Sequence, residues 1–188
     1  MMTRTRSSAV GAVAVLLAVV LLAAQGAHAA EAVSKEYQIK AAFLYNFAKF
    51  VEWPPASFAD ASSPIIIGVL GQNPFGGELE QVVKDRKING RDVLIKTLET
   101  VEQAASVQIV FLAAGEDARI PKLLAAVSDK AVLTVGESDA FASQGGAIRF
   151  VLDGDKVRFR INLTPADRAH LKIGGQLQQL AKQVERSP

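Results

Sequence analysis

Four short, mostly apolar runs constrain the fold of this chain more than any other feature. They are separated by segments with helical spacing, such as Glu78 to Lys87 and Ile120 to Val127. A run without polar alternation is typical of a strand that is covered on both faces, as the strands of parallel sheets are. The pattern predicts a parallel sheet with helices on either side, built from strands Ile65 to Leu70, Val93 to Leu98, Val107 to Leu112 and Val132 to Val135.

The segment from Ser34 to Val51 predicts a helix that is apolar over most of its surface. Ser34 is placed to cap the helix, and Pro54-Pro55 is placed to end it. Only a narrow polar stripe remains, formed by Gln38, Asn46 and Lys49. We therefore expect the helix to be buried through its two apolar faces, Ile39, Phe43, Phe47 and Phe50 on one and Tyr37, Leu44, Ala48 and Val51 on the other.

The C-terminal part changes to an antiparallel pattern. Ile148 to Leu152 and Val157 to Leu163 flank the turn residues Asp153-Gly154-Asp155, which predicts a β-hairpin. Arg149, Arg158 and Arg160 could converge on one side of this hairpin and bind an anionic ligand or an acidic partner. The favoured interpretation is a solvated outer face on which basic residues protect an edge strand.

A final helix is expected after the hairpin. Thr164-Pro165-Ala166-Asp167 combines a cap residue, a first-turn proline and a first-turn acid. The helix should run to about Glu185, with Gly174-Gly175 interrupting it and able to split it in two. Together the elements predict one three-layer α/β domain, with a mainly parallel sheet flanked by helices and a C-terminal antiparallel β-hairpin.

The first 30 residues have the three-part layout of a secretory signal peptide. Arg4 and Arg6 precede an apolar run from Ala9 to Ala24, and the small-residue site Ala27-His28-Ala29 follows. The run is shorter than the roughly 20 residues that span a bilayer, so a membrane anchor is disfavoured. We expect residues 1–30 to be removed and residues 31–188 to form the exported domain.

Composition excludes two classes of protein for the exported part. The whole chain has 21 basic and 19 acidic side chains, and residues 1–30 contain two of the basic ones, Arg4 and Arg6, and no acidic one. Residues 31–188 therefore have 19 of each, and they lack the strong positive charge of a nucleic-acid binder. The chain has no cysteine. Neither a disulfide nor a lipidated cysteine is therefore available, and the core alone must supply stability.

No set of residues predicts an active site, a cofactor site or a metal site. His170 is the only histidine after residue 30, which excludes a histidine-based triad. The glycines of Gly68 to Gly77 fit neither a dinucleotide loop nor a P-loop, and Gly136 to Ser138 is no nucleophile elbow. Asp153 and Asp155 are the remaining carboxylate pair, and such residues are ordinary turn formers.

Aromatic side chains near the N-terminus of the domain are the candidates for binding a partner. Most of them should be core, but Trp53 precedes Pro54-Pro55 and is expected at a rim, where an aromatic residue can anchor another protein. Tyr45 and Lys49 lie on the less apolar stripe of the predicted helix. The candidate partner-binding residues are therefore Tyr45, Lys49, Trp53 and Phe58.

The segment from Glu36 to Pro54 resembles the opening signature of the YfiR-like periplasmic proteins. Further segments resemble that family in the same order, so the resemblance covers nearly the whole exported chain. They are Ile67 to Phe75, Lys87-Ile88-Asn89-Gly90-Arg91, Leu133 to Ser138 with Phe141 and Gly145-Gly146, and Val157 to Leu163.

The resemblance implies a periplasmic repressor with no catalytic activity of its own. Such a protein binds an inner-membrane diguanylate cyclase or another membrane signalling protein and lowers cyclic di-GMP and biofilm formation; an outer-membrane lipoprotein can sequester the repressor. Family members often carry cysteines near the positions of Gly68 and Val107, and here no thiol is present. The residues leave homodimer formation open.

A second hypothesis comes from the fold class rather than from the resemblance. Open α/β sheets bind ligands at the carboxyl ends of their strands. The chain could then be a small-molecule sensor or carrier of the envelope, with the turn after Leu70 and the segment Gly136 to Ser138 lining the site.

Overall fold

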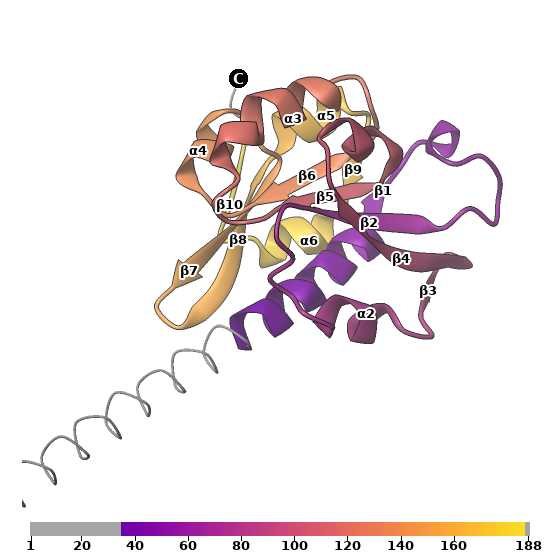
Figure 1. Cartoon of the computed structure of the whole chain (residues 1–188), viewed down its shortest axis with the longest axis horizontal. Helices are drawn as coiled ribbons and strands as arrows, with labels where there is room; N and C mark the ends of the chain where they lie inside the picture. Colours follow the sequence, from indigo (N-terminus) through magenta and orange to yellow (C-terminus); the bar gives the residue numbers. More distant parts are fainter. Residues whose placement is uncertain (1–34, 187–188) are drawn as a thin grey trace, which may run out of the picture. The chain divides into compact units, whose positions relative to one another are not determined.

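A computed structural model describes residues 35–186 of the chain (Figure 1). Residues 37–186 belong to one compact unit. The predicted signal peptide lies outside the described residues, and within these residues no helix is long and apolar enough to cross a membrane.

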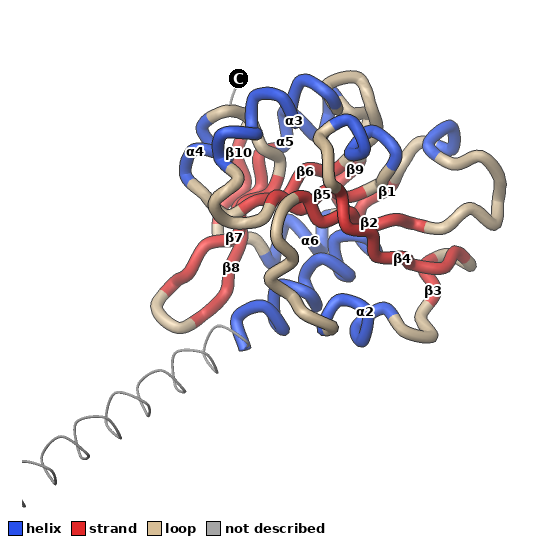
Figure 2. Tube along the Cα trace, in the orientation of Figure 1, coloured by secondary structure: helices blue, strands red, loops and turns tan. Residues whose placement is uncertain are grey.

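The central sheet has eight strands in the order β10-β8-β7-β6-β5-β2-β4-β3 (Figure 2). Its middle five strands, β4, β2, β5, β6 and β7, run parallel, which confirms the predicted parallel sheet. Their order is that of a doubly wound fold, in which the first parallel strand, here β2, has later strands on both sides of it. The bounds of these five are Arg91–Leu98, Ile65–Leu70, Ile109–Leu112, Leu133–Gly136 and Ile148–Asp153.

Antiparallel strand pairs lie near both edges of the sheet. The predicted hairpin is confirmed, because β7 pairs with β8 (Lys156–Asn162) in antiparallel register from Ile148↔Ile161 to Asp153↔Lys156. At the other edge the short strand β3 (Lys87–Ile88) pairs only with the first two residues of β4.

Helices cover the two faces of the sheet as separate layers (Figure 1). One layer contains the N-terminal helix (residues 35–50), α2 (Glu78–Val83) and α6 (Gly175–Leu180). The other contains the 3₁₀ turn η2 (Glu102–Ser106), α3 (Ile120–Ala126) and α4 (Asp139–Ser143). Along β5, Ile109 and Phe111 belong to the first core and Val110 and Leu112 to the second, which confirms the predicted three-layer arrangement.

The N-terminal helix packs on the sheet through an aromatic cluster. Phe47 is fully buried and its ring centroid lies 5.6 Å from that of Phe150 and 5.0 Å from that of Phe159. Two residues depart from the predicted faces, since Ile39 is 44% exposed and Lys40 is only 4% exposed. Lys40 is buried because its ammonium group pairs with the carboxylate of Glu137 beyond the end of β6.

The C-terminal helix predicted from Thr164 to about Glu185, which Gly174-Gly175 is expected to interrupt, does not form as predicted, although a separate helix does begin at Gly175. The segment forms four short elements instead: α5 (Leu163–Arg168), β9 (Lys172–Ile173), α6 and β10 (Gln183–Glu185). The side chain of Asn162, not of Thr164, caps α5 by accepting from the backbone N–H of Thr164 at 3.1 Å. His170 then takes a φ of 57°, which ends the helical path, and β9 pairs with β1 (Val51–Glu52).

Two other predicted elements are shorter than expected. Helix α2 ends at Val83 rather than at Lys87, because Asp85 has a φ of 56° that a helix does not accommodate. Strand β5 begins at Ile109 rather than at Val107, because Val107 is the C-cap residue of η2.

Candidate functional site

The chain turns sharply where the N-terminal helix ends, and this turn builds one wall of a pocket. Val51 and Glu52 form β1 and pair with Ile173 and Lys172 of β9. The backbone N–H of Gly174 donates to the carbonyl oxygen of Phe50 at 2.9 Å. A Cβ at position 174 would lie 2.8 Å from that oxygen, so only glycine allows this close approach.

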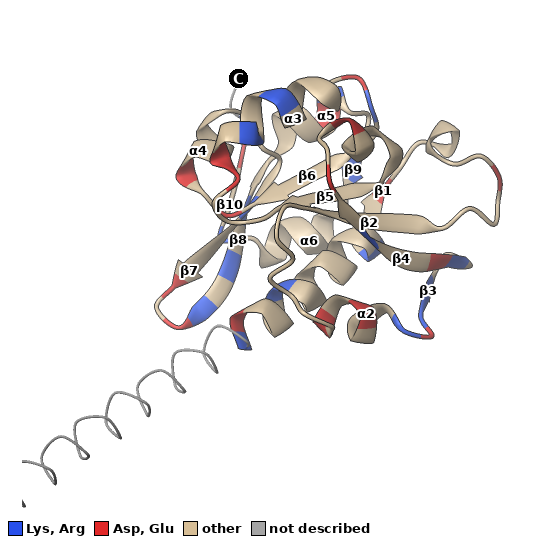
Figure 3. Ribbon diagram, viewed as in Figure 1, with Lys and Arg blue, Asp and Glu red and all other residues tan. Residues whose placement is uncertain are grey.

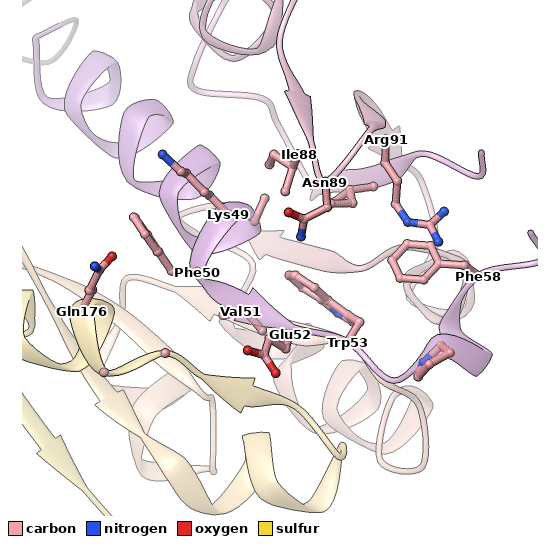
Figure 4. A pocket seen from close by; sticks show the side chains of 15 residues that line it. Lys49, Phe50, Val51, Glu52, Trp53, Phe58, Ile88, Asn89, Arg91 and Gln176 are labelled. Carbon is pink, nitrogen blue, oxygen red and sulfur yellow. The ribbon is translucent and has the colours of Figure 1, made fainter. Parts of the chain in front are cut away.

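The pocket beside this turn has a volume of about 540 Å³ (Figure 4). Its walls come from four parts of the chain: the segment from the end of the N-terminal helix to Phe58, the start of β2, the turn between β3 and β4, and the start of α6. Its lining includes the side chains of Lys49, Glu52, Trp53, Phe58, Asn89, Arg91 and Gln176.

Trp53 lies between Asn89 and Phe58 in this pocket (Figure 4). Its side chain is half-buried, and its indole Nε1 is buried without a hydrogen-bond acceptor among the described residues. A buried donor without an acceptor costs about 1–3 kcal/mol. The indole therefore gains from any small shift that gives its N–H an acceptor.

Arg91 holds the loop that carries Phe58. The guanidinium carbon lies 3.8 Å from the centre of the Phe58 ring, and Nη1 donates to the carbonyl oxygens of Asp60 and Ser63 at 2.9 and 2.6 Å. The side chain of Ser62 donates to the Asp60 carboxylate, and this bond is the main cause that lowers the pKa of Asp60. The aromatic wall of the pocket is thus fixed by a cation–π contact and by hydrogen bonds.

The structure brings together three of the four candidate partner-binding residues. Lys49, Trp53 and Phe58 line the pocket. Tyr45 does not line it; its half-buried ring lies 5.3 Å from the guanidinium of Arg86. Asn89, Arg91 and Gln176 were not selected as site residues from the sequence, although Asn89 and Arg91 belong to a segment that resembles the YfiR-like family.

The carboxyl ends of the parallel strands are occupied by the protein's own side chains. Glu137 accepts from the ammonium group of Lys40 at 2.5 Å and from the hydroxyl of Tyr37 at 3.1 Å. Beside β2, a Cβ at Gly71 would meet the Glu116 side chain at 2.6 Å, and a Cβ at Gly136 would meet the Phe141 ring at 2.6 Å. The residues proposed for a ligand crevice at this edge are therefore in contact with other side chains of the protein.

Other residues considered for chemistry are dispersed. His170 is exposed and lies after α5 instead of on a helix. Asp153 pairs with Lys182 at 2.9 Å, and this bond lowers the pKa of its carboxyl group, while Asp155 is exposed in the hairpin turn. Among residues 35–186 no group of three or more histidine, aspartate or glutamate side chains is arranged to hold a metal ion.

The three hairpin arginines differ in burial. Arg158 is exposed, as the solvated-face interpretation predicted, whereas Arg149 and Arg160 are partly buried. The Nε atoms of both buried arginines have no hydrogen-bond partner among the described residues.

Comparison with known proteins gives one family match. The sequence profile of the family described as YfiR/HmsC-like matches residues 37–182. No curated protein matches the chain. A solved structure described as the ABC domain in complex with L-Trp from Streptococcus pneumonia is similar with a TM-score of 0.47 and 14% identity, over 64% of this chain and 56% of that one. The chain thus spans little more than half of that protein, and a likeness of this size carries no functional argument.

Proposed function

The chain belongs to the YfiR/HmsC-like family, and from this premise we propose that it is a periplasmic regulatory protein that binds an inner-membrane signalling protein. The proposed partner is a diguanylate cyclase, whose activity the bound regulator lowers. The observation that carries the proposal is the family match over residues 37–182, which includes the whole wall of the pocket around Trp53.

The Trp53 pocket has the composition of a protein-binding surface. Trp53 and Phe58 give it an aromatic centre, and Lys49, Glu52 and Gln176 give it a polar rim. Tryptophan is over-represented among residues that dominate binding energy, especially where a polar rim excludes water around it. A carbonyl oxygen of the partner could also accept from the Trp53 Nε1 group, which has no acceptor among residues 35–186.

Repression requires that the regulator prefer one state of its partner. A bound protein shifts a two-state equilibrium only by the ratio of its affinities for the two states. Moving the cyclase from 99% active to 99% inactive needs a ratio of roughly 10⁴. An outer-membrane lipoprotein that competes for the same surface would release the cyclase, whereas thiol oxidation cannot regulate a chain without cysteine.

Site-specific photocrosslinking in cells tests this proposal. A crosslinking amino acid replaces Lys49 at the rim of the pocket, and the matched control replaces Lys122, an exposed lysine of α3 that does not line it. We expect an inner-membrane protein with a periplasmic segment and a cyclase domain to be captured from position 49 and not from position 122. Capture of that protein equally from both positions, or of other copies of this chain alone, would contradict the proposal.

A second candidate is a sensor or carrier of a small molecule, which the size of the Trp53 pocket favours. Its volume of about 540 Å³ is within the range of ligand sites. A ligand that binds only the folded protein raises the melting temperature. A thermal-shift screen with nucleotides, amino acids and sugars supports this candidate only if a compound raises the melting temperature of the unsubstituted protein and not that of Trp53→Ala. If no compound raises the melting temperature, the regulatory function is favoured.

A further inference from the structure

Two arginines face each other on the outer side of the hairpin. Arg149 of β7 is directly opposite Arg160 of β8 in the antiparallel register, and Val151 is opposite Arg158 one step closer to the tip. Opposed residues of an antiparallel pair have Cα atoms about 4.5–5.5 Å apart. Like charges in this position are destabilising, so the arrangement calls for a compensating negative charge.

Both arginine side chains are partly buried. The Arg149 side chain is only 13% exposed, and the Nε atoms of Arg149 and Arg160 are buried without a partner among the described residues. Burial is the main cause that lowers the pKa of Arg149, and the charge of Arg160 is the second. Two adjacent, partly buried cations whose Nε donors have no partner among the described residues distinguish this pair from the exposed Arg158.

A pocket opens at this pair. It has a volume of about 380 Å³ and is bordered by α4, by the start of β7 and by β10. Ala142 and Ala147 also line it. The pocket is therefore large enough for a small organic molecule that carries an anionic group.

Two carboxylates, those of Asp139 and Glu185, lie in the same pocket as the arginines, and both are exposed to solvent. Asp139 pairs with Nη1 of Arg149, but its side chain is 97% exposed. Glu185 on β10 lines the pocket, is exposed, and accepts from the side chain of Gln183 at 2.7 Å. Figure 3 shows basic segments along β8 and an acidic segment at α4. Solvent screens the exposed carboxylates more strongly than the partly buried arginines.

We propose that Arg149 and Arg160 bind the phosphate group of a small soluble phosphate ester in this pocket. Guanidinium groups bind phosphate oxygens through paired N–H donors. A phosphate dianion supplies two negative charges to the two guanidinium groups, in place of the exposed Asp139 carboxylate that pairs with Arg149, and the ester substituent lies against the pocket wall. This site is separate from the Trp53 pocket and does not depend on the proposed regulatory function.

Titration calorimetry tests the site, with protein isolated from the envelope of cells that express the full chain. The probes are inorganic phosphate, glycerol 3-phosphate, acetate and phosphatidylglycerol vesicles, at constant ionic strength and pH. We expect saturable binding of both phosphate probes, weakened about tenfold or more in Arg149→Gln and Arg160→Gln. The matched control Arg158→Gln, on the same face of the hairpin, should change affinity by less than about twofold.

Two additional variants keep the test decisive if a glutamine variant folds poorly. Arg160→Lys keeps the charge but loses the paired donors and should still weaken binding. Glu185→Gln removes a negative charge from the pocket and should therefore strengthen the binding of phosphate. Absence of saturable phosphate binding, or binding unchanged in Arg160→Gln, would overturn the proposal. Equal binding of acetate would overturn the assignment to phosphate, and binding to vesicles but not to free phosphate would overturn the assignment to a soluble ligand.

Discussion

The buried ion pair between Lys40 and Glu137 offers the sharpest test of how the N-terminal helix is held on the sheet. The ammonium nitrogen lies 2.5 Å from the carboxylate, and the two side chains are 5% and 16% exposed. Lys40→Met keeps most of the aliphatic volume and removes the charge. Glu137 then retains the Tyr37 hydroxyl at 3.1 Å as a donor but loses its countercharge.

Removing one partner of a buried pair costs about 3–5 kcal/mol, because the other charge stays buried. The remaining Tyr37 hydrogen bond and the residual exposure of Glu137 favour the lower limit, about 3 kcal/mol. For a domain of this size each kcal/mol lowers the melting temperature by about 2–4 °C, so Lys40→Met should lower it by about 6–12 °C. The double variant Lys40→Met/Glu137→Met should lie within about 1 kcal/mol of the unsubstituted protein, because no uncompensated charge remains.

Urea unfolding, followed by circular dichroism, measures all four corners of this double-mutant cycle. Lys87→Met is the matched control, since its pair with Asp92 has a similar length of 2.6 Å but side chains that are 59% and 62% exposed. That substitution should cost less than about 1 kcal/mol. A cost for Lys40→Met as small as the control, or additive effects in the double variant, would refute the reasoning.

Three further substitutions test local parts of the structure. Gly174→Ala should destabilise the protein by about 1–3 kcal/mol, because the new Cβ would meet the backbone oxygen of Phe50. A Cβ at position 175 has open space, so Gly175→Ala should be neutral or stabilising by up to about 1 kcal/mol. Urea unfolding measures the free energy of unfolding of both variants. The hydrogen bond from Lys122 is the main cause that lowers the pKa of Glu102 to about 2, so this pair contributes stability above pH 4.5 that is lost as the pH falls toward 2. Lys122→Gln should raise the Glu102 pKa toward 4.5 in an NMR titration, and an unchanged value would refute the assigned cause.

Most of the sheet could be predicted from sequence because its strands carry their own signal. Ile65–Leu70 and Leu133–Gly136 are buried on both faces, so their apolar runs show no polar alternation. The hairpin was equally clear, because two strand patterns flank a turn with glycine. Burial of Lys40 could not be predicted, because its partner Glu137 lies 97 residues away and helical periodicity counts Lys40 as a surface residue.

The C-terminal segment was predicted wrongly because its structure depends on distant backbone groups. Strand β9 has only two residues and exists through its pairing with β1, and β10 exists through its pairing with β8. Local propensity carries no record of either pairing. The same limit applies to the pocket, where Trp53 and Phe58 are neighbours in sequence but Arg91 and Gln176 reach the site only through the fold.

The cellular concentration of cyclic di-GMP tests the central claim most directly. Cells that lack this chain are compared with cells complemented by the unsubstituted protein, by Trp53→Ala, and by the control Lys122→Ala, each secreted to the same level. We expect the deletion to raise cyclic di-GMP, the unsubstituted protein and Lys122→Ala to restore the low level, and Trp53→Ala to fail. An unchanged concentration in the deletion strain, or full restoration by Trp53→Ala, would contradict the proposed regulation through the Trp53 pocket.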